Sequence, residues 1–256
     1  MLTLTDSRLC EARVDTGALR DNARVLRGAA GAQSLLVDVS ADGHGHGAIE
    51  TVMAALEGGA QWLSVSTVAD AVALRESGIR VPILTSFAMH CRAEVPDVFL
   101  RGDPAVPELF AAGVSLYGVG PELSRLRLRP AMRVSATVLT TKTIQPGDGV
   151  SYGYTFRAEK VTNLAMIAIG YADGLDRRAG NTASVMLGGR PRRIVGRVAM
   201  NAAVLDLGAD ESAPGEEAVV FGGSGEPSAD SWAQSLDITA DEVVTVFGQR
   251  LTRSYR

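Results

Sequence analysis

The residues in this chain best suited to chemistry lie in one short loop. Asp42, His44 and His46 alternate with glycines and follow an apolar run over 34–40. In β/α barrel proteins the catalytic groups gather at the carboxyl ends of the strands, where this loop would lie. Histidine titrates near neutral pH, so His44 or His46 could move protons to or from a substrate. The loop therefore predicts an acid/base site.

The same loop offers residues for three other chemistries. The two histidines with His90 and Asp42 would supply enough ligands for a metal ion, but alternate residues on a glycine-rich loop do not reliably converge. Ser40 and His44 could form a nucleophile and base, although no third orienting group is identifiable. The glycines lack the Lys-Ser/Thr pair that ends a phosphate-binding loop. We predict no metal site.

Buried strands and amphipathic helices must position this loop. Apolar runs alternate with helical patterns before residue 130, which predicts repeated βα units. The predicted strands are 34–40, 62–66, 81–85 and 113–118, and the predicted helices are 16–27, 48–57 and 68–77. Residues 88–109 contain three prolines and show no clear period.

After Pro130 the pattern changes to short β-type runs separated by glycine-rich turns. These runs cover 134–144, 165–169, 184–187, 192–198, 203–207 and 218–221, with one short helix near 230–236. We therefore predict an α/β domain over 1–130 and an all-β domain over 131–256. Arg125, Arg127 and Arg129 are interpreted as a strand face or interface rather than an anion site.

The first domain is too short for a complete barrel. A (β/α)₈ barrel takes about 250 residues, and at least about 200. Only three or four barrel-type strands precede residue 130 here. The chain therefore predicts a partial β/α barrel, which must cover its open edge by dimerising or by another device.

Composition limits the partners and the compartment. The 256 residues are 46% hydrophobic and carry a net charge of -4, so there is no electrostatic case for nucleic acid or a membrane surface. No apolar stretch is long enough for a membrane span. The two cysteines, Cys10 and Cys91, predict a reducing cytoplasm. Lys142 and Lys160 are the only lysines.

Four segments together resemble the alanine racemase family, whose members use pyridoxal phosphate (PLP) and combine a barrel with a β domain. Residues 39–47 (VSADGHGHG) resemble the family's VKADGYGHG, and 150–153 (VSYG) match its VSYG. Residues 169–174 (IGYADG) match IGYADG, and 195–201 (VGRVAMN) resemble VGRVSMD. The matches run in order over most of the chain, but the middle of the family's barrel is missing.

The resemblance also shows where the PLP site departs from the family. The lysine that forms the Schiff base falls at Ser40, whose hydroxyl cannot form an imine. The arginine that faces the pyridine nitrogen falls at Ala111, and the tyrosine that holds the phosphate falls at Asp241. A carboxylate there would repel an anion. The family's Asn-Ser phosphate pair has no clear equivalent around 89–95, so we expect no cofactor.

The other half of the family's site is retained. The resemblance implies that Tyr152 is a catalytic base and that Tyr171 and Met200 line the substrate's carboxylate pocket. The alternative is that both tyrosines remain because they pack at a dimer interface. His44 replaces a family tyrosine, whereas His46 occupies a family position with a structural hydrogen-bonding role.

These observations predict a repurposed, PLP-independent acid/base enzyme of isomerase, cyclase or lyase type acting on a small molecule in specialised metabolism. Its catalytic residues are Tyr152, His44 and Asp42. Tyr171 and Met200, together with Ser40 and His46, are expected at the substrate. We expect a homodimer with a pocket shared between subunits. The alternative is a non-catalytic pseudoenzyme that binds a ligand or a partner racemase.

Overall fold

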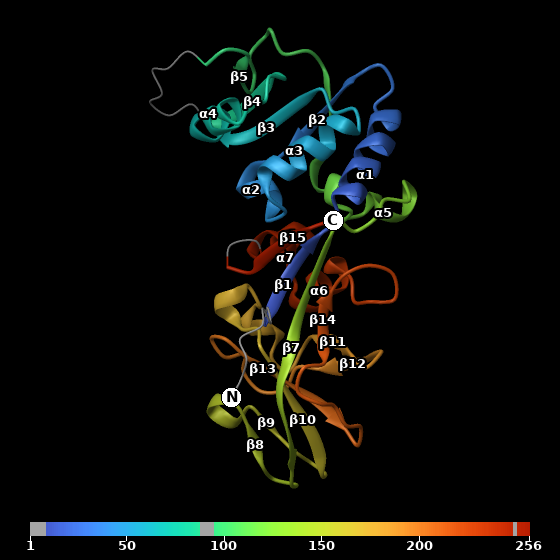
Figure 1. The fold of residues 1–256 in the computed structure, drawn as a ribbon, viewed down its shortest axis with the longest axis vertical. Helices are drawn as coiled ribbons and strands as arrows, with labels where there is room; N and C mark the ends of the chain where they lie inside the picture. The colour runs from blue at the N-terminus through green and yellow to red at the C-terminus, as the bar shows by residue number, and fades with distance from the viewer. Residues whose placement is uncertain (1–8, 88–94, 248–249) are drawn as a thin grey trace. The chain divides into compact units, whose positions relative to one another are not determined.

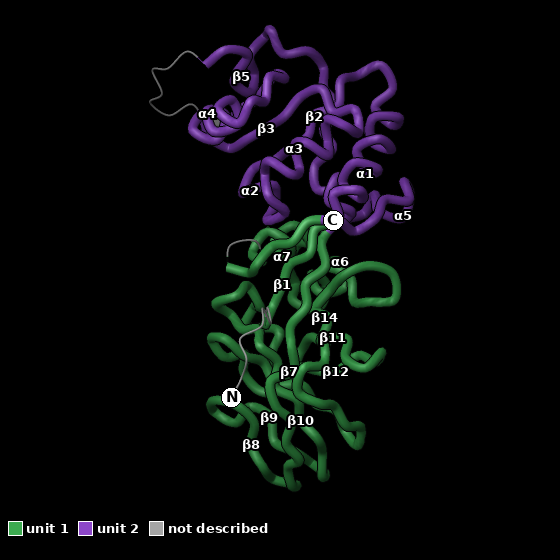
Figure 2. Tube along the Cα trace, viewed as in Figure 1, with its two compact units in different colours: residues 1–14, 132–255 green, residues 15–131, 256 purple. Residues whose placement is uncertain are grey.

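The computed structural model describes residues 9–87, 95–247 and 250–256, drawn as a ribbon in Figure 1. The chain forms two compact units, which Figure 2 colours separately. One unit comprises Met1–Val14 and Met132–Tyr255, and is called the β unit here. The other comprises Asp15–Ala131 with Arg256, and is called the α/β unit. Each is described by itself.

The α/β unit consists of strands followed by helices along the chain. Its strands are β2 (Ser34–Asp38), β3 (Trp62–Thr67), β4 (Ile83–Phe87), β5 (Val98–Leu100) and β6 (Leu109–Ala111). Its helices are α1 (Thr16–Ala29), α2 (Ser40–His44), α3 (Ala48–Glu57), α4 (Val68–Glu76) and α5 (Glu122–Arg125), with a 3₁₀ helix η1 at Gly113–Tyr117. The predicted α/β class is confirmed for this part of the chain.

The strands form one parallel sheet in the order β5-β4-β3-β2-β6. Strands β2 to β5 follow one another in chain order, and β6 returns to pair with β2. Pairing of the last strand with the first is the connection that closes a β/α barrel. In this sheet β6 makes that pairing with β2, but β5 and β6 do not pair with each other. They are therefore the two edges among the described strands. Only residues 101–108 connect these edges, and no helix lies between them.

Both faces of this sheet bear apolar side chains, as expected for a parallel sheet. Leu35, Val37 and Leu63 point to one face and are buried. The opposite face carries a cluster of Leu36, Trp62 and Leu84 with the partly buried Phe99, Val106 and Leu109. Val106 belongs to the 101–108 connection, so this short segment packs on the face that would line the inside of a barrel.

Helix α1 anchors this unit through a buried amide. Asp15 caps the helix by accepting the backbone N–H of Ala18 at 2.8 Å. Asn22 is 2% exposed, and its Nδ2 donates to the carbonyl oxygens of Leu116 and Arg129 at 2.9 and 2.8 Å. Its Oδ1 accepts the backbone N–H of Arg129 at 2.8 Å. Asn22 therefore joins α1 to η1 and to the end of the unit.

The β unit is built on an eight-stranded sheet in the order β12-β11-β14-β7-β1-β15, with β10 pairing with both β7 and β13. Its strands are β1 (Cys10–Val14), β7 (Met132–Ile144), β10 (Thr162–Ile167), β11 (Ser184–Leu187), β12 (Arg190–Arg193), β13 (Ala203–Gly208), β14 (Glu217–Phe221) and β15 (Thr252–Tyr255). A separate hairpin joins β8 (Gly149–Val150) and β9 (Phe156–Arg157). Helices α6 (Ala229–Leu236) and α7 (Ala240–Val246) follow β14, and three 3₁₀ turns are η2 (Tyr152–Tyr154), η3 (Tyr171–Asp173) and η4 (Arg177–Ala179).

The two ends of the chain meet in this sheet. β1 pairs antiparallel with β7 and parallel with β15 (Figure 1). The first strand therefore belongs to the β unit, although it precedes the whole α/β unit in the sequence. Among the described residues no helix combines the length and apolar character that a membrane span requires.

Three sequence predictions differ from the structure. Residues 113–118 form η1 rather than a strand, because Gly113 and Gly118 have φ of +52° and +69°. The strand predicted over 192–198 is instead β12, since Gly196 has φ of +73° and ends extended structure. The arginines 125–129 do not form a strand face. Arg125 lies at the end of α5 beside Glu122, and Arg129 pairs with Asp21 at 2.9 Å.

Arg133 on β7 joins two other parts of the β unit. Its two Nη atoms donate to the Glu217 carboxylate at 2.7 and 2.8 Å, and its Nε donates to Glu226 at 2.9 Å. The hydrogen bonds from Arg133 lower the pKa of Glu217 to about 2. A depressed carboxyl pKa stabilises the folded state above the ordinary value of 4.5, and this stabilisation disappears as pH falls toward 2.

We therefore expect Arg133→Met to lower the free energy of unfolding by about 1–2 kcal/mol at pH 7, a range that allows for the half-exposed Glu217. The difference from wild type should shrink between pH 4.5 and about 2. Urea denaturation at several pH values measures both effects. Arg190→Met is the control, because Arg190 pairs with Asp210 at an exposed position. An equal loss of unfolding free energy in both variants at every pH would contradict the stabilising role given to the Arg133–Glu217 pair.

Candidate functional site

The carboxyl end of β2 carries a hydrogen-bonded pair of side chains. Ser40 Oγ donates to Asp38 Oδ1 at 2.6 Å, and the backbone N–H of Ser40 donates to the same oxygen at 3.0 Å. Both residues are partly buried. The pair places a carboxylate and a hydroxyl at this strand end, and sequence reasoning had not identified Asp38.

The predicted loop after β2 is a left-handed helical turn. Ala41, Asp42 and His44 have φ of +51°, +57° and +49°, with Gly43 between them at +62°. Left-handed geometry is unfavourable by roughly 1–2 kcal/mol for each residue with a Cβ atom. A Cβ at Gly43 would also lie 2.8 Å from Thr51 Oγ1. Surrounding contacts must therefore hold the turn, and such strain is concentrated at functional sites.

Tyr117 supplies much of that support. Its side chain is fully buried, and its hydroxyl donates to the carbonyl oxygen of Asp38 at 2.6 Å. Its ring centroid lies 4.8 Å from that of His44 and 4.6 Å from that of His46. Burial raises the pKa of Tyr117 well above its ordinary value, and the Asp38 and Asp42 carboxylates raise it further. Tyr117 is therefore a neutral platform for the histidines and no proton acceptor.

The predicted residues of this turn differ in accessibility. His46 is fully buried, and its Nδ1 lies 3.0 Å from the His44 carbonyl oxygen, so its ring braces the turn. His44 is partly exposed and Asp42 is exposed. Asp42 Oδ1 accepts the backbone N–H of Ala48 at 2.8 Å and so caps α3. His44 is the turn's accessible titratable ring.

The metal hypothesis gains no support within the described part of the chain. Residues 9–87, 95–247 and 250–256 contain no group of three or more His, Cys, Asp or Glu side chains placed to hold an ion. His90 and the segment expected to hold the phosphate pair lie largely outside the described residues.

In the β unit, Tyr152 lies on a tightly held turn. Its side chain is 74% exposed. The preceding Ser151 has φ of +59° and ψ of -171°, a region almost restricted to glycine. Ser151 Oγ donates to the Arg197 carbonyl oxygen at 2.7 Å, and a Cβ at Gly153 would lie 3.4 Å from the Arg197 guanidinium. The segment around Arg197 therefore fixes the turn that presents Tyr152.

The segment around Arg197 also positions Tyr171 and Met200, the other predicted residues of this unit. The backbone N–H of Tyr171 donates to the Ala199 carbonyl at 3.0 Å, and that of Ala172 donates to the Met200 carbonyl at 2.9 Å. Tyr171 and Met200 are 39% and 53% exposed. The Arg177 guanidinium lies 5.2 Å from the centre of the Tyr171 ring. The turns that present Tyr152, Tyr171 and Met200 thus all meet at residues 195–201.

Comparison with known proteins identifies the family. The family model for the alanine racemase C-terminal domain matches residues 131–255, and the model for the N-terminal domain matches residues 14–101. Together these matches cover most of the chain. The chain belongs to the alanine racemase family.

Individual members of the alanine racemase family are similar over nearly their whole length. The alanine racemases of Salinispora arenicola and Thermobifida fusca are 32% and 31% identical, over 96% and 97% of this chain and 98% of each relative. The solved structure of alanine racemase from D-cycloserine-producing Streptomyces lavendulae is 27% identical, with a TM-score of 0.87 and 98% coverage of both chains. That of Streptomyces coelicolor is 25% identical, with a TM-score of 0.82, covering 97% of this chain and 98% of that one.

The residues present do not fit the cofactor that the alanine racemase family uses. Residues 15–131 contain no lysine, so the unit that carries β2 has no side-chain amine for a Schiff base. At the carboxyl end of β2, the Ser40 hydroxyl is bonded to a carboxylate. At the start of α7, where the phosphate would be held, Glu242 accepts the backbone N–H of Thr239 at 2.8 Å beside Asp241. Two carboxylates at a helix start do not favour a phosphate.

Proposed function

We propose that this member of the alanine racemase family is an acid/base enzyme that works without PLP, of isomerase, cyclase or lyase type. The observation that carries the proposal is the contrast between its two units. The turns bearing Tyr152, Tyr171 and Met200 are tied together by hydrogen bonds, whereas the strand end at Ser40 offers no amine. Proton transfer between side chains and substrate requires no Schiff base.

The catalytic groups we assign are Tyr152 and His44, with Asp42 as a third candidate. Tyr152 is exposed, and its phenol can donate or accept one proton. His44 is partly exposed and is held against Tyr117 by ring contact, which limits the positions its nitrogens can take. Tyr171, Met200 and Ser40 are assigned to substrate contact. His46 is assigned to holding the turn, because its ring is buried.

The proposed working form is a homodimer in which each substrate is served by Tyr152 of one subunit and His44 of the other. Two observations support it: the resemblance to the family, and an α/β sheet that leaves β5 and β6 as edges. We also propose that the chain lacks barrel strands between β5 and β6. An alignment of 364 positions is longer than the 256 residues here, and the N-terminal family match ends at residue 101, directly after β5.

Mixing two inactive variants tests the shared site. Tyr152→Phe and His44→Gln each remove one group, so a mixed dimer has one intact site and one doubly altered site. With free exchange of subunits, half the dimers are mixed, and activity should recover to about a quarter of wild type. Activity is detected as deuterium incorporated from D₂O into a panel of small amino and hydroxy acids. No recovery from a mixture shown to exchange would contradict the shared site.

The second candidate is a non-catalytic protein that binds a ligand or a partner racemase. The exposure of Tyr152 and Met200 favours it, because exposed aromatic and methionine side chains also serve as contact surfaces. Deuterium incorporation at any carbon, lost in Tyr152→Phe, would exclude this candidate. Tight binding of a racemase without any exchange would establish it.

A further inference from the structure

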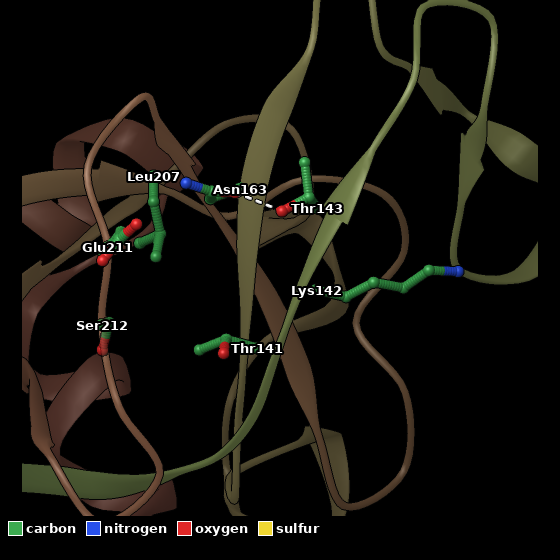
Figure 3. Close-up of a pocket in the computed structure, with 7 residues that line it drawn as sticks. All are labelled: Thr141, Lys142, Thr143, Asn163, Leu207, Glu211 and Ser212. Atoms are coloured by element: carbon green, nitrogen blue, oxygen red, sulfur yellow. Dashed lines mark hydrogen bonds between the residues drawn. The ribbon is translucent and has the colours of Figure 1, made fainter.

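Two grooves lie on opposite faces of the part of the β unit where β7, β10 and β13 pair. Lys142 is opposite Leu164 and Thr140 is opposite Met166, while Met166 is opposite Val204. Because successive strand residues point to opposite faces, these side chains share one face and Thr141 and Thr143 lie on the other. Figure 3 shows the groove beside Thr141, with the Lys142 side chain extending away from it.

The groove beside Thr141 is polar, and three of its lining side chains are hydrogen-bonded within the protein. Thr143 Oγ1 donates to Asn163 Oδ1 at 2.7 Å (Figure 3). Asn163 Nδ2 donates to the Asp210 carbonyl at 3.0 Å. Ser212 Oγ donates to Glu216 at 2.9 Å. The polar groups of Thr143, Asn163 and Ser212 are therefore already engaged within the protein, and we base no proposal on this groove.

The groove on the other face is apolar. It encloses about 240 Å³, and its lining includes Ile144, Val150, Leu164, Met166 and Val204. Ile144, Val150 and Leu164 also belong to a buried hydrophobic cluster, against which Val204 packs. Its volume is below the roughly 300–1,000 Å³ of pockets for drug-sized ligands, so it fits a small apolar chain.

One cation lies at this groove. Lys142 is exposed, and within the described part of the chain its ammonium has neither an ion pair nor a hydrogen bond. Thr140 on the same face and Ser151 are further polar residues of the lining, and Ser151 Oγ is bonded to the Arg197 carbonyl oxygen. An apolar lining with a single charged group selects a ligand that has an apolar body and one opposite charge.

From this juxtaposition we infer that the groove between β7, β10 and β8 binds a short-chain carboxylate, with its chain on Leu164, Met166 and Val204 and its carboxylate at Lys142. This inference goes beyond the proposed function and does not depend on it. The groove also includes Ser151, the strained residue directly before Tyr152. A bound carboxylate would therefore contact the turn that presents Tyr152.

Methyl NMR of the full-length protein with hexanoate as the probe tests the site. We expect a saturable shift of the Met166 methyl signal with hexanoate and a much smaller one with neutral hexanamide. Lys142→Gln should weaken hexanoate binding about fivefold, the value of an exposed ion pair. Lys160→Gln is the matched control, because Lys160 is the other lysine and does not line the groove.

Bound hexanoate should also shift the Tyr152 amide signal, because the groove includes Ser151. Met166→Trp is an independent variant that fills the groove and leaves Lys142 in place, and it should abolish this amide shift. Equal affinity for hexanoate and hexanamide would overturn the inference, as would a Lys142→Gln protein that binds like wild type. Absence of any saturable shift at hexanoate concentrations that leave the protein folded would also overturn it. Tyr152→Phe should bind hexanoate normally, so loss of turnover and loss of this site are distinguishable.

Discussion

Replacing Tyr152 by phenylalanine should reduce turnover by about 10²–10⁴-fold, the usual effect of removing a general acid or base. The fold should be unaffected, because the ring is 74% exposed and its hydroxyl makes no hydrogen bond to any described residue. The rate of deuterium incorporation from D₂O, measured with the substrate found in the panel, gives the change. Thermal denaturation should give the same midpoint as wild type.

The neighbouring tyrosine provides the control for this substitution. Tyr154 lies on the same 3₁₀ turn, is 60% exposed and has its ring under the Arg157 guanidinium at 5.5 Å. Tyr154→Phe removes an equivalent hydroxyl from a position to which no chemistry is assigned, so its activity should stay within about twofold of wild type. Full activity in Tyr152→Phe would remove this residue from the mechanism and favour a contact role.

Replacing Gly118 by alanine should lower the free energy of unfolding by about 3–5 kcal/mol, a large part of a typical total of 5–15 kcal/mol. A Cβ at this position would lie 1.9 Å from the Arg129 carbonyl oxygen, and the residue has φ of +69°. Relief of that clash requires movement of the backbone next to Tyr117, the platform for His44. Urea denaturation measures the loss, and amide exchange at residues 40–46 reports whether the turn loosens.

Gly113 is a matched control at the other end of η1. It has φ of +52°, but a Cβ there would meet nothing within 4 Å. Gly113→Ala should therefore lower stability by only about 1–2 kcal/mol, the cost of left-handed geometry alone. Equal losses in the two variants would show that steric contact with Arg129 is not the cause.

Local sequence signals predicted the regular elements well. Helix 48–57 agrees with α3, and 16–27 agrees with α1 except at its last turn. Asp15 and Thr67 stand where α1 and α4 begin, and each caps its helix as its residue type predicts. Helix α7 was missed, although Thr239 and Glu242 form a capping box that the sequence displays.

Local sequence signals do not reveal which strands and side chains far apart in the sequence contact one another. Nothing near Cys10–Val14 indicates that this strand pairs with residues 252–255 at the other end of the chain. The roles of Asn22 and Tyr117 likewise depend on partners about 80–107 residues away. Asp38 was hidden because a single carboxylate at a strand end resembles an ordinary boundary residue, and only the structure shows it bonded to Ser40.

At the end of β2, sequence and structure together show which groups stand where the family has its PLP lysine. The sequence places Ser40 at the position of the family's lysine, and the structure adds a carboxylate at 2.6 Å from its hydroxyl. The position of the family's imine-forming lysine thus carries a hydrogen-bonded hydroxyl. We therefore propose that this chain has no side chain able to hold PLP as a Schiff base at the end of β2.

Absorbance of the purified protein with PLP, followed by borohydride and mass spectrometry of its peptides, tests that claim directly. We expect the spectrum of free PLP and no pyridoxyl group on any peptide beyond the level seen in urea-unfolded protein. Serum albumin, which has many exposed lysines, serves as a positive control for trapping. A persistent Schiff-base band, with pyridoxyl fixed stoichiometrically on Lys142 or Lys160 of the folded protein, would contradict the account.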